Sequence, residues 1–101
     1  MRYIIIVGVI KSFANKTTHQ LFAGIHNKRL DPSLERRAKM KLAILNRVTT
    51  LQELTIPPAN RLEKLSGVRA GQYSIRVNNQ YRICFTWEGG NAYDVEFVDY
   101  H

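Results

Sequence analysis

Apolar and polar side chains alternate along the last third of the chain, and this alternation predicts β-strands. Residues 73–77 and 81–87 each place an apolar side chain at every second position, which is the period of a strand with one buried face. Asn78-Asn79 separates the two runs, and residues of this type favour a hairpin turn. We therefore expect two antiparallel strands joined by a tight turn.

A third alternating run follows a second turn at Gly89-Gly90-Asn91. Its period again assigns the side chains to two faces of a sheet. The residues expected on the buried face are Tyr93, Val95 and Phe97, and those expected on the other face are Asp94, Glu96 and Val98. The C-terminal region is thus predicted to form an antiparallel sheet of three strands.

Helical spacing dominates the region before Pro57-Pro58, where two helices are predicted. The first covers residues 15–26, with Thr17 or Thr18 as a candidate N-cap. Its apolar positions are Leu21, Phe22 and Ile25.

The second helix has clearer signals. Asp31 is a candidate N-cap and Pro32 suits the first helical position. Apolar side chains recur at helical spacing at Leu34, Ala38, Leu42, Leu45 and Val48. We expect this stripe to face the core.

Residues 1–10 are rich in β-branched side chains and predict a first buried strand. The run is far shorter than the ~20 residues that span a bilayer. Lys11 follows it without a small-residue cleavage site, so neither membrane insertion nor secretion is expected. The predicted order is β-α-α-β-β-β, an α+β domain over residues 1–101 in which an antiparallel sheet packs against two N-terminal helices.

Charge changes this picture because the chain carries a net +7. Residues 1–49 hold ten basic and two acidic side chains, whereas residues 50–101 hold five and six. Such an excess favours a polyanionic partner. On the second helix, Arg36, Lys39 and Arg47 point away from the apolar stripe, with Arg37 and Lys41 on its flank. This predicts a cationic surface that faces phosphates.

The candidate chemistry lies on the sheet face opposite the core, where Arg76 and Arg82 emerge from adjacent strands and the chain ends at Asp99-Tyr100-His101. Arginine binds phosphate oxygens with two parallel N–H groups, and histidine transfers protons near neutral pH. A base that removes the 2′-hydroxyl proton of RNA lets that oxygen attack the adjacent phosphate and leaves a 2′,3′-cyclic phosphate. This chemistry needs no metal or cofactor, and no metal-ligand spacing is apparent in the sequence.

Two structural interpretations compete with this one. Arg76 and Arg82 could form a cross-strand ladder with Glu96 and Asp94, which is a common arrangement on the solvent face of a sheet. Cys84 is the single cysteine and stands in the middle of a predicted strand. We interpret it as a small buried side chain in a reducing cytosol rather than as a nucleophile.

The run GQYSIRVNNQYRICF at residues 71–85, DVE at residues 94–96 and the terminal DYH at residues 99–101 resemble the HigB toxins of the RelE/ParE superfamily. The likeness extends back through RLEKL at residues 61–65 to IKSF at residues 10–13. It therefore covers nearly the whole chain beyond residue 9.

The resemblance implies a microbial RNase-like fold and the toxin of a type II toxin–antitoxin system. Such a toxin is a ribosome-dependent, metal-independent endoribonuclease that cuts mRNA in the cytoplasm and inhibits translation. The resemblance also implies a HigA-like helix-turn-helix antitoxin as its partner. Operator DNA would be bound only through the antitoxin complex.

The same resemblance assigns roles to particular residues. His101 corresponds to the catalytic terminal histidine, with Tyr100 and Asp99 as its companions. Arg82 corresponds to the sheet arginine near the scissile phosphate, and Arg76 to a basic position seen in many relatives. Whether His101 acts as base or as acid stays open.

The chain departs from the family pattern in two places. Some relatives place a Lys or His before the turn at Gly67, where this chain has Glu63 and Ser66. The basic role is then expected of Lys64 or Arg69, and the full RNA- and ribosome-binding set is Lys64, Arg69, Arg36, Lys39 and Lys41. Relatives usually begin near the IKSF motif, so residues 1–8 are expected to be an N-terminal extension.

Two other function classes remain open at this point. A ParE-like toxin that inhibits a gyrase needs no acid–base residue, and it would arrest growth through DNA damage. A catalytically silent RNA- or ribosome-binding module would keep its toxicity after His101→Ala.

Overall fold

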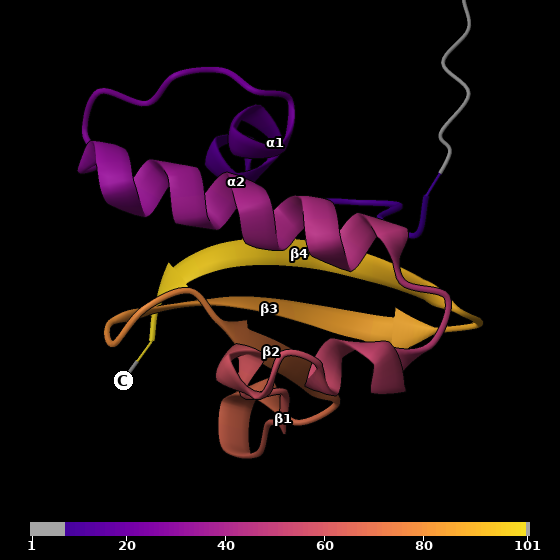
Figure 1. Cartoon of the computed structure of the whole chain (residues 1–101). Helices are drawn as coiled ribbons and strands as arrows, with labels where there is room; N and C mark the ends of the chain where they lie inside the picture. The colour runs from indigo at the N-terminus through magenta and orange to yellow at the C-terminus, as the bar shows by residue number, and fades with distance from the viewer. Residues whose placement is uncertain (1–7, 101) are drawn as a thin grey trace, which may run out of the picture.

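The computed structural model describes residues 8–100, which form an α+β fold with both helices on one side of an antiparallel sheet (Figure 1). The sheet has four strands in the order β1-β2-β3-β4. The elements in chain order are α1 (Lys16–Phe22), α2 (Pro32–Arg47), β1 (Glu63–Lys64), β2 (Gln72–Arg76), β3 (Tyr81–Glu88) and β4 (Asn91–Asp99). The predicted fold class is confirmed, and β1 is a strand that the alternation pattern did not indicate.

The predicted first strand can be followed only in part, since residues 1–7 lie outside the described residues. The segment after Gly8 runs parallel to β4, with isolated bridges between Ile10 and Ala92 and between Phe13 and Val95. The Lys11 amide donates to the Ala92 carbonyl at 2.8 Å, and the Ala92 amide donates to the Val9 carbonyl at 2.8 Å. This segment therefore pairs with the free edge of β4, which would otherwise expose unpaired backbone groups.

The α2 helix begins as its sequence predicts. Asp31 Oδ2 accepts hydrogen bonds from the amides of Ser33 at 3.0 Å and Leu34 at 3.2 Å, an N-cap arrangement typically worth about 1 kcal/mol. Ala38, Leu42 and Leu45 have no exposed surface. The buried cluster that these side chains form with the sheet also contains Ile75, Ile83, Phe85 and Val95. The predicted apolar stripe is confirmed as the core face.

The α1 helix is shorter than predicted and has a different cap. Asn15 Oδ1, rather than a threonine, accepts from the Thr18 amide at 2.9 Å. Thr18 is buried, and its hydroxyl oxygen accepts from the Phe97 amide at 3.0 Å. The helix ends at Phe22, and Gly24 follows with a φ of 85°, a conformation that glycine adopts readily. Ile25 consequently lies beyond the helix and is 51% exposed.

A β-bulge corrects the predicted faces of β4. The pairing of β3 with β4 changes register between Cys84 and Thr86. This irregularity is opposite Asp94, whose φ is 52°. The extra residue inverts the alternation, so Ala92 is fully buried while Tyr93 pairs with Thr86 outside the core cluster. The prediction that Tyr93 faces the core is therefore wrong, because a bulge moves each preceding side chain to the other face.

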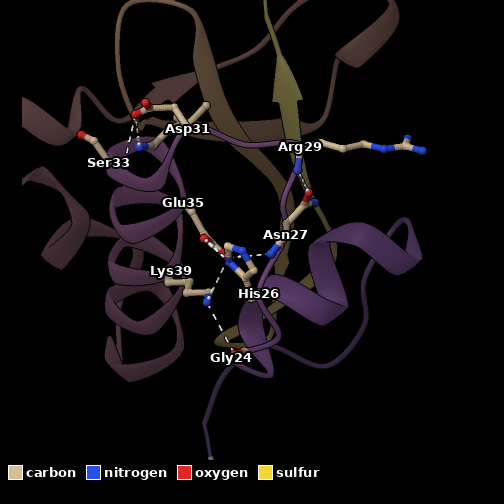
Figure 2. A network of polar contacts seen from close by, with 9 residues as sticks. Gly24, His26, Asn27, Arg29, Asp31, Ser33, Glu35 and Lys39 are labelled. Atoms are coloured by element: carbon tan, nitrogen blue, oxygen red, sulfur yellow. Dashed lines mark hydrogen bonds and ion pairs between the residues drawn. The ribbon is translucent and has the colours of Figure 1, made fainter.

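The loop between the two helices is fastened to α2 by Glu35 (Figure 2). This carboxylate accepts from the Asn27 amide at 2.7 Å and from His26 Nδ1 at 2.9 Å, and it pairs with Lys39 Nζ at 3.2 Å. These contacts, led by the Asn27 hydrogen bond, lower the pKa of Glu35.

Within residues 8–100, no helix is long and apolar enough to cross a membrane.

Candidate active site

The strand register places two arginines side by side on the sheet face away from the helices. Arg76 on β2 is directly opposite Arg82 on β3, and the neighbouring pair Ile75 and Ile83 belongs to the core. Because side chains alternate along a strand, both arginines emerge on the other face. The predicted juxtaposition of Arg76 and Arg82 is confirmed.

Arg82 is held in place by its neighbours and retains only 9% of its exposure. Its Nε donates to Ser74 Oγ at 2.6 Å, and its Nη2 donates to the Arg61 carbonyl at 2.5 Å. Glu63 Oε1 lies 3.8 Å from the same Nη2. Within residues 8–100, Nη1 makes no hydrogen bond, so one edge of the guanidinium is left for another acceptor.

The hairpin between β2 and β3 positions Arg76. Asn78 Oδ1 accepts from the amides of Gln80 at 2.8 Å and Tyr81 at 2.7 Å, which closes the predicted turn. Asn79 Oδ1 then accepts from Arg76 Nη2. Both asparagines of the turn therefore act through their side chains, one to shape the backbone and the other to orient Arg76.

The end of β4 lies beside this hairpin (Figure 1). Asp99 is opposite Tyr81 in the register, and its Oδ2 accepts from Gln80 Nε2 at 3.0 Å. The Tyr100 amide donates to the Gln80 carbonyl at 3.0 Å. The strand thus fixes the chain end as far as Tyr100, whereas His101 lies outside the described residues.

These elements enclose a cleft of about 400 Å³. Its lining residues are Arg61, Glu63, Arg76, Asn78, Asn79, Arg82 and Tyr100. The cleft thus brings together three of the five predicted catalytic residues, namely Arg76, Arg82 and Tyr100. Asp99 is not among the lining residues.

Sequence reasoning did not place Arg61 or Glu63 at this site. Arg61 has a φ of 44°, an uncommon left-handed conformation for a residue other than glycine. Its carbonyl is the one that accepts from Arg82 Nη2. No local pattern indicated this turn, and Glu63 stood out only as a departure from the family pattern.

The predicted cross-strand ladder is wrong in its partners. Glu96 pairs with Arg69 Nη1 at 3.1 Å rather than with a sheet arginine. The carboxylate near Arg82 comes instead from Glu63 on β1.

The two other basic residues proposed near the turn do not line the cleft. Arg69 is half-buried between Glu96 and Gln72, at 3.1 and 3.0 Å. Lys64 is exposed and pairs with Tyr73 in the register, which places it on the opposite sheet face from Arg82. A role in RNA binding stays a prediction for both.

The cations of α2 divide into exposed and buried groups, which corrects the expected surface. Lys41 is 8% exposed, and its Nζ donates to the Oδ1 atom of the buried Asn60. Burial lowers the pKa of Lys41, and the nearby charges of Arg76 and Arg37 lower it further. Lys41 is therefore not part of the exposed cationic surface, because Asn60 gives its ammonium a partner inside the fold.

Arg36 and Arg37 remain on that surface. Both are exposed, and with Ser33, Lys39 and Met40 they line a shallow groove of about 660 Å³. Lys39 is half-buried, since its ammonium is engaged with Glu35 and with the Gly24 carbonyl at 3.5 Å (Figure 2).

The interpretation of Cys84 is confirmed to the extent that its side chain is buried. Burial raises the pKa of its thiol, so the reactive thiolate is disfavoured. In the described part of the chain, no three His, Cys, Asp or Glu side chains are grouped so that they could hold a metal ion.

Comparison with known proteins places these features in a family context. The family model described as "RelE-like toxin of type II toxin-antitoxin system HigB" matches residues 11–101. Toxin HigB-1 of Vibrio cholerae is 40% identical over 90 residues, covering 88% of this chain and 94% of that protein. Endoribonuclease HigB of Proteus vulgaris is 32% identical over 98 residues, covering 92% of this chain and 100% of that protein.

A solved structure shows a similar fold at low sequence identity. The YoeB–YefM complex from Staphylococcus aureus contains a chain that matches with a TM-score of 0.52 and 14% identity. The match covers 91% of this chain and 97% of that one. At this identity the likeness shows the fold alone.

Proposed function

The chain belongs to the HigB family of RelE-like toxins of type II toxin–antitoxin systems, and we propose that it is an endoribonuclease that cuts mRNA on the ribosome. One observation carries this proposal: Arg76 on β2, Arg82 on β3 and Tyr100 after β4 line the same cleft. The Proteus vulgaris relative is itself named an endoribonuclease. Inhibition of translation in the cytoplasm would follow.

The cleft suits the cleavage of RNA by its own 2′-hydroxyl. Arg82 Nη1 and Arg76 bind the scissile phosphate and stabilise the charge that builds up as the 2′-oxygen attacks phosphorus. The 2′-hydroxyl loses its proton as a new 2′-O–P bond forms, the P–O5′ bond breaks, and the 5′-oxygen takes a proton as it leaves, so no net proton is gained or lost. His101 is the proposed proton-transfer residue, with Tyr100 and Asp99 as its companions, and the products are a 2′,3′-cyclic phosphate and a 5′-hydroxyl.

Binding to the ribosome is assigned to a separate surface. Arg36 and Arg37 are exposed on the outer side of α2, where cations attract RNA phosphates and release counterions. Lys39 contributes charge at the edge of this surface, although Glu35 partly neutralises it. We name Arg36, Arg37 and Lys39 the α2 basic surface.

The partner that silences the toxin is proposed to be a HigA-like antitoxin with a helix-turn-helix domain. Membership of a toxin–antitoxin family supports an antitoxin partner. The antitoxin complex, rather than the toxin alone, would then bind operator DNA.

Primer extension on a defined mRNA in programmed ribosomes tests this function. Wild-type protein should produce cuts that disappear without ribosomes and weaken about 10²- to 10⁴-fold in His101→Ala. Absence of cuts from folded wild-type protein would rule out the nuclease and favour gyrase inhibition or silent binding. Unchanged cutting by His101→Ala would instead remove His101 from the chemistry.

A further inference from the structure

On the basis of the proposed nuclease, we propose that Asn60 is a positioning residue for RNA cleavage. Its side chain holds the turn whose next carbonyl, that of Arg61, fixes the guanidinium of Arg82. Asn60 is fully buried and is not among the residues that line the cleft. It therefore acts on the reaction through Arg82 and has no contact of its own with the RNA.

The side chain of Asn60 ties α2 to the segment that leads into the cleft. Its Oδ1 accepts from Lys41 Nζ on α2. Its Nδ2 donates to the Leu54 carbonyl at 3.2 Å and to the Ile56 carbonyl at 3.3 Å. An ammonium only donates and a carbonyl only accepts, so these partners fix which end of the carboxamide faces each of them. A buried group with all these partners satisfied is held in one orientation.

The turn after this side chain has an unusual backbone. The 3₁₀ turn Pro58–Asn60 packs against β2 and ends at Arg61, whose φ is 44°. A left-handed residue other than glycine persists only where its surroundings hold it. The backbone supplies two such contacts, since the amides of Asn60 and Arg61 donate to the Pro57 and Pro58 carbonyls at 2.9 and 3.0 Å. The Asn60 side chain is what joins this turn to α2.

The Arg61 carbonyl holds one end of the Arg82 guanidinium. Arg82 Nε donates to Ser74 Oγ at 2.6 Å, whereas Nη2 donates to the Arg61 carbonyl at 2.5 Å. The second contact of Nη2, with the Ser74 carbonyl, is longer at 3.4 Å. If the Arg61 carbonyl moved, the guanidinium could rotate about its contact with Ser74. The orientation of Nη1 toward a bound phosphate therefore depends on the turn that Asn60 holds.

The network of Asn60 lies close behind the cleft. Burial lowers the pKa of Lys41, and the charge of Arg76 lowers it further, so the ammonium on Asn60 is within electrostatic reach of a residue that lines the cleft. A change at Asn60 should thus reach Arg82 without removing any side chain that a substrate would contact. Small displacements of this kind are costly, because catalysis depends on the position of the charged group.

A double-mutant cycle on programmed ribosomes tests the role of Asn60. Asn60→Ala should lower the single-turnover cleavage rate about 10²-fold, the loss that a misplacement of ~1 Å can cause. Ribosome affinity should not change. In the Arg82→Lys background, Asn60→Ala should lower the rate by less than about twofold, because the group that it positions is already gone. A merely structural role would lower the rate by the same factor in both backgrounds.

Two further variants control for stability. Ala38→Gly weakens α2 at a buried helical position outside the network, and it should cut like wild type at temperatures where urea denaturation shows all proteins to be folded. Asn60→Asp keeps an acceptor for Lys41 but loses the donation to the Leu54 and Ile56 carbonyls. It should also impair cleavage, and it decides the question if Asn60→Ala does not fold.

Nuclear magnetic resonance of the ¹⁵N-labelled free protein gives a readout that needs no cleavage. A guanidinium held at Nε and Nη2 rotates slowly, so Arg82 in wild type should give separate Nη signals, assigned by their loss in Arg82→Lys. In Asn60→Ala these signals should merge, because the hold on Nη2 is lost. Ala38→Gly should keep them separate.

The outcomes separate this inference from the proposed function. Wild-type protein that does not cut RNA would overturn the nuclease itself, and the Nη signals would then still decide whether Asn60 orients Arg82. Wild-type protein that cuts, together with Asn60→Ala at the same rate, would overturn the role of Asn60 alone. An equal loss in both backgrounds, or Nη signals that Asn60→Ala leaves unchanged, would overturn it as well.

Discussion

The cleft and the α2 basic surface both present arginine, but they hold it in opposite ways. Arg82 in the cleft is almost fully buried, and its guanidinium is fixed by Ser74 and by the Arg61 carbonyl. Arg36 and Arg37 on α2 are exposed. A fixed guanidinium has already lost its rotamer freedom on folding, so binding a phosphate costs it little further entropy.

This difference suggests a division between chemistry and attraction. A reaction needs a cation at one position relative to the transition state, because preorganised charge is what lowers the barrier. Attraction to a large polyanion needs only cations near a surface, and it weakens as salt increases. We therefore expect substitutions in the cleft to change cleavage and substitutions on α2 to change binding.

The largest effect is expected for Arg82→Lys. Lysine keeps the charge but cannot contact Ser74, the Arg61 carbonyl and a phosphate with one planar group, so single-turnover cleavage should fall about 10²- to 10³-fold. Ribosome affinity should not change. Arg47→Lys on the exposed side of α2 is the matched control. A parallel loss of ribosome affinity would contradict the division of roles.

The α2 basic surface is tested by changing Arg36 and Arg37 together to alanine. Ribosome affinity should fall, and the slope of log K against log salt should decrease by about one for each phosphate that the variant no longer binds. The cleavage rate of the bound complex should be unaffected. Titration of labelled protein with ribosomes at several salt concentrations measures the affinity and the slope, and an unaltered salt slope would exclude this surface.

Lys41 is a basic residue of α2 that should affect stability instead. Lys41→Ala leaves the buried Asn60 oxygen without its donor, which typically costs about 1–3 kcal/mol in the free energy of unfolding. Urea denaturation measures this loss, and the exposed Lys28→Ala serves as control. Ribosome affinity should remain at the wild-type value, and a lower affinity would return Lys41 to the binding surface.

The pH dependence of the Lys41 effect has a defined sign. Because the folded-state pKa of Lys41 is lowered from 10.5, the unfolded chain binds more protons in the interval between the two values. Stability of the wild type should therefore rise, relative to Lys41→Ala, as pH increases through that interval.

The smallest effect is expected for Glu35→Gln on α2, where Glu35 holds the loop between the two helices through Asn27 and His26. The folded-state pKa of Glu35 lies below 4.5, so its contribution to stability is present above that pH and is lost as pH falls through the folded-state value. The variant should be less stable than wild type at pH 7, and the gap should close in acid. Urea denaturation at pH 7 and pH 3, with Glu88→Gln as control, measures this gap. A gap that persists at pH 3 would contradict this assignment.

The local elements were predictable because their signals lie within a few residues of one another. Asp31 and Pro32 start α2 through contacts inside one helical turn. Asn78 closes its hairpin by accepting from the amides two and three residues further on. The juxtaposition of Arg76 and Arg82 followed from that turn, since a hairpin sets the register of both strands.

The sequence by itself thus determined the helices, the hairpin and the pair of sheet arginines. Only the tertiary structure decided that Asp94 forms a bulge, that Lys41 turns inward to Asn60, and that Arg61 and Glu63 complete the cleft. The physical reason is sequence distance: Arg82 meets the Arg61 carbonyl across 21 residues, and Lys41 meets Asn60 across 19. Such contacts depend on how whole elements pack, which the period of a local pattern does not encode.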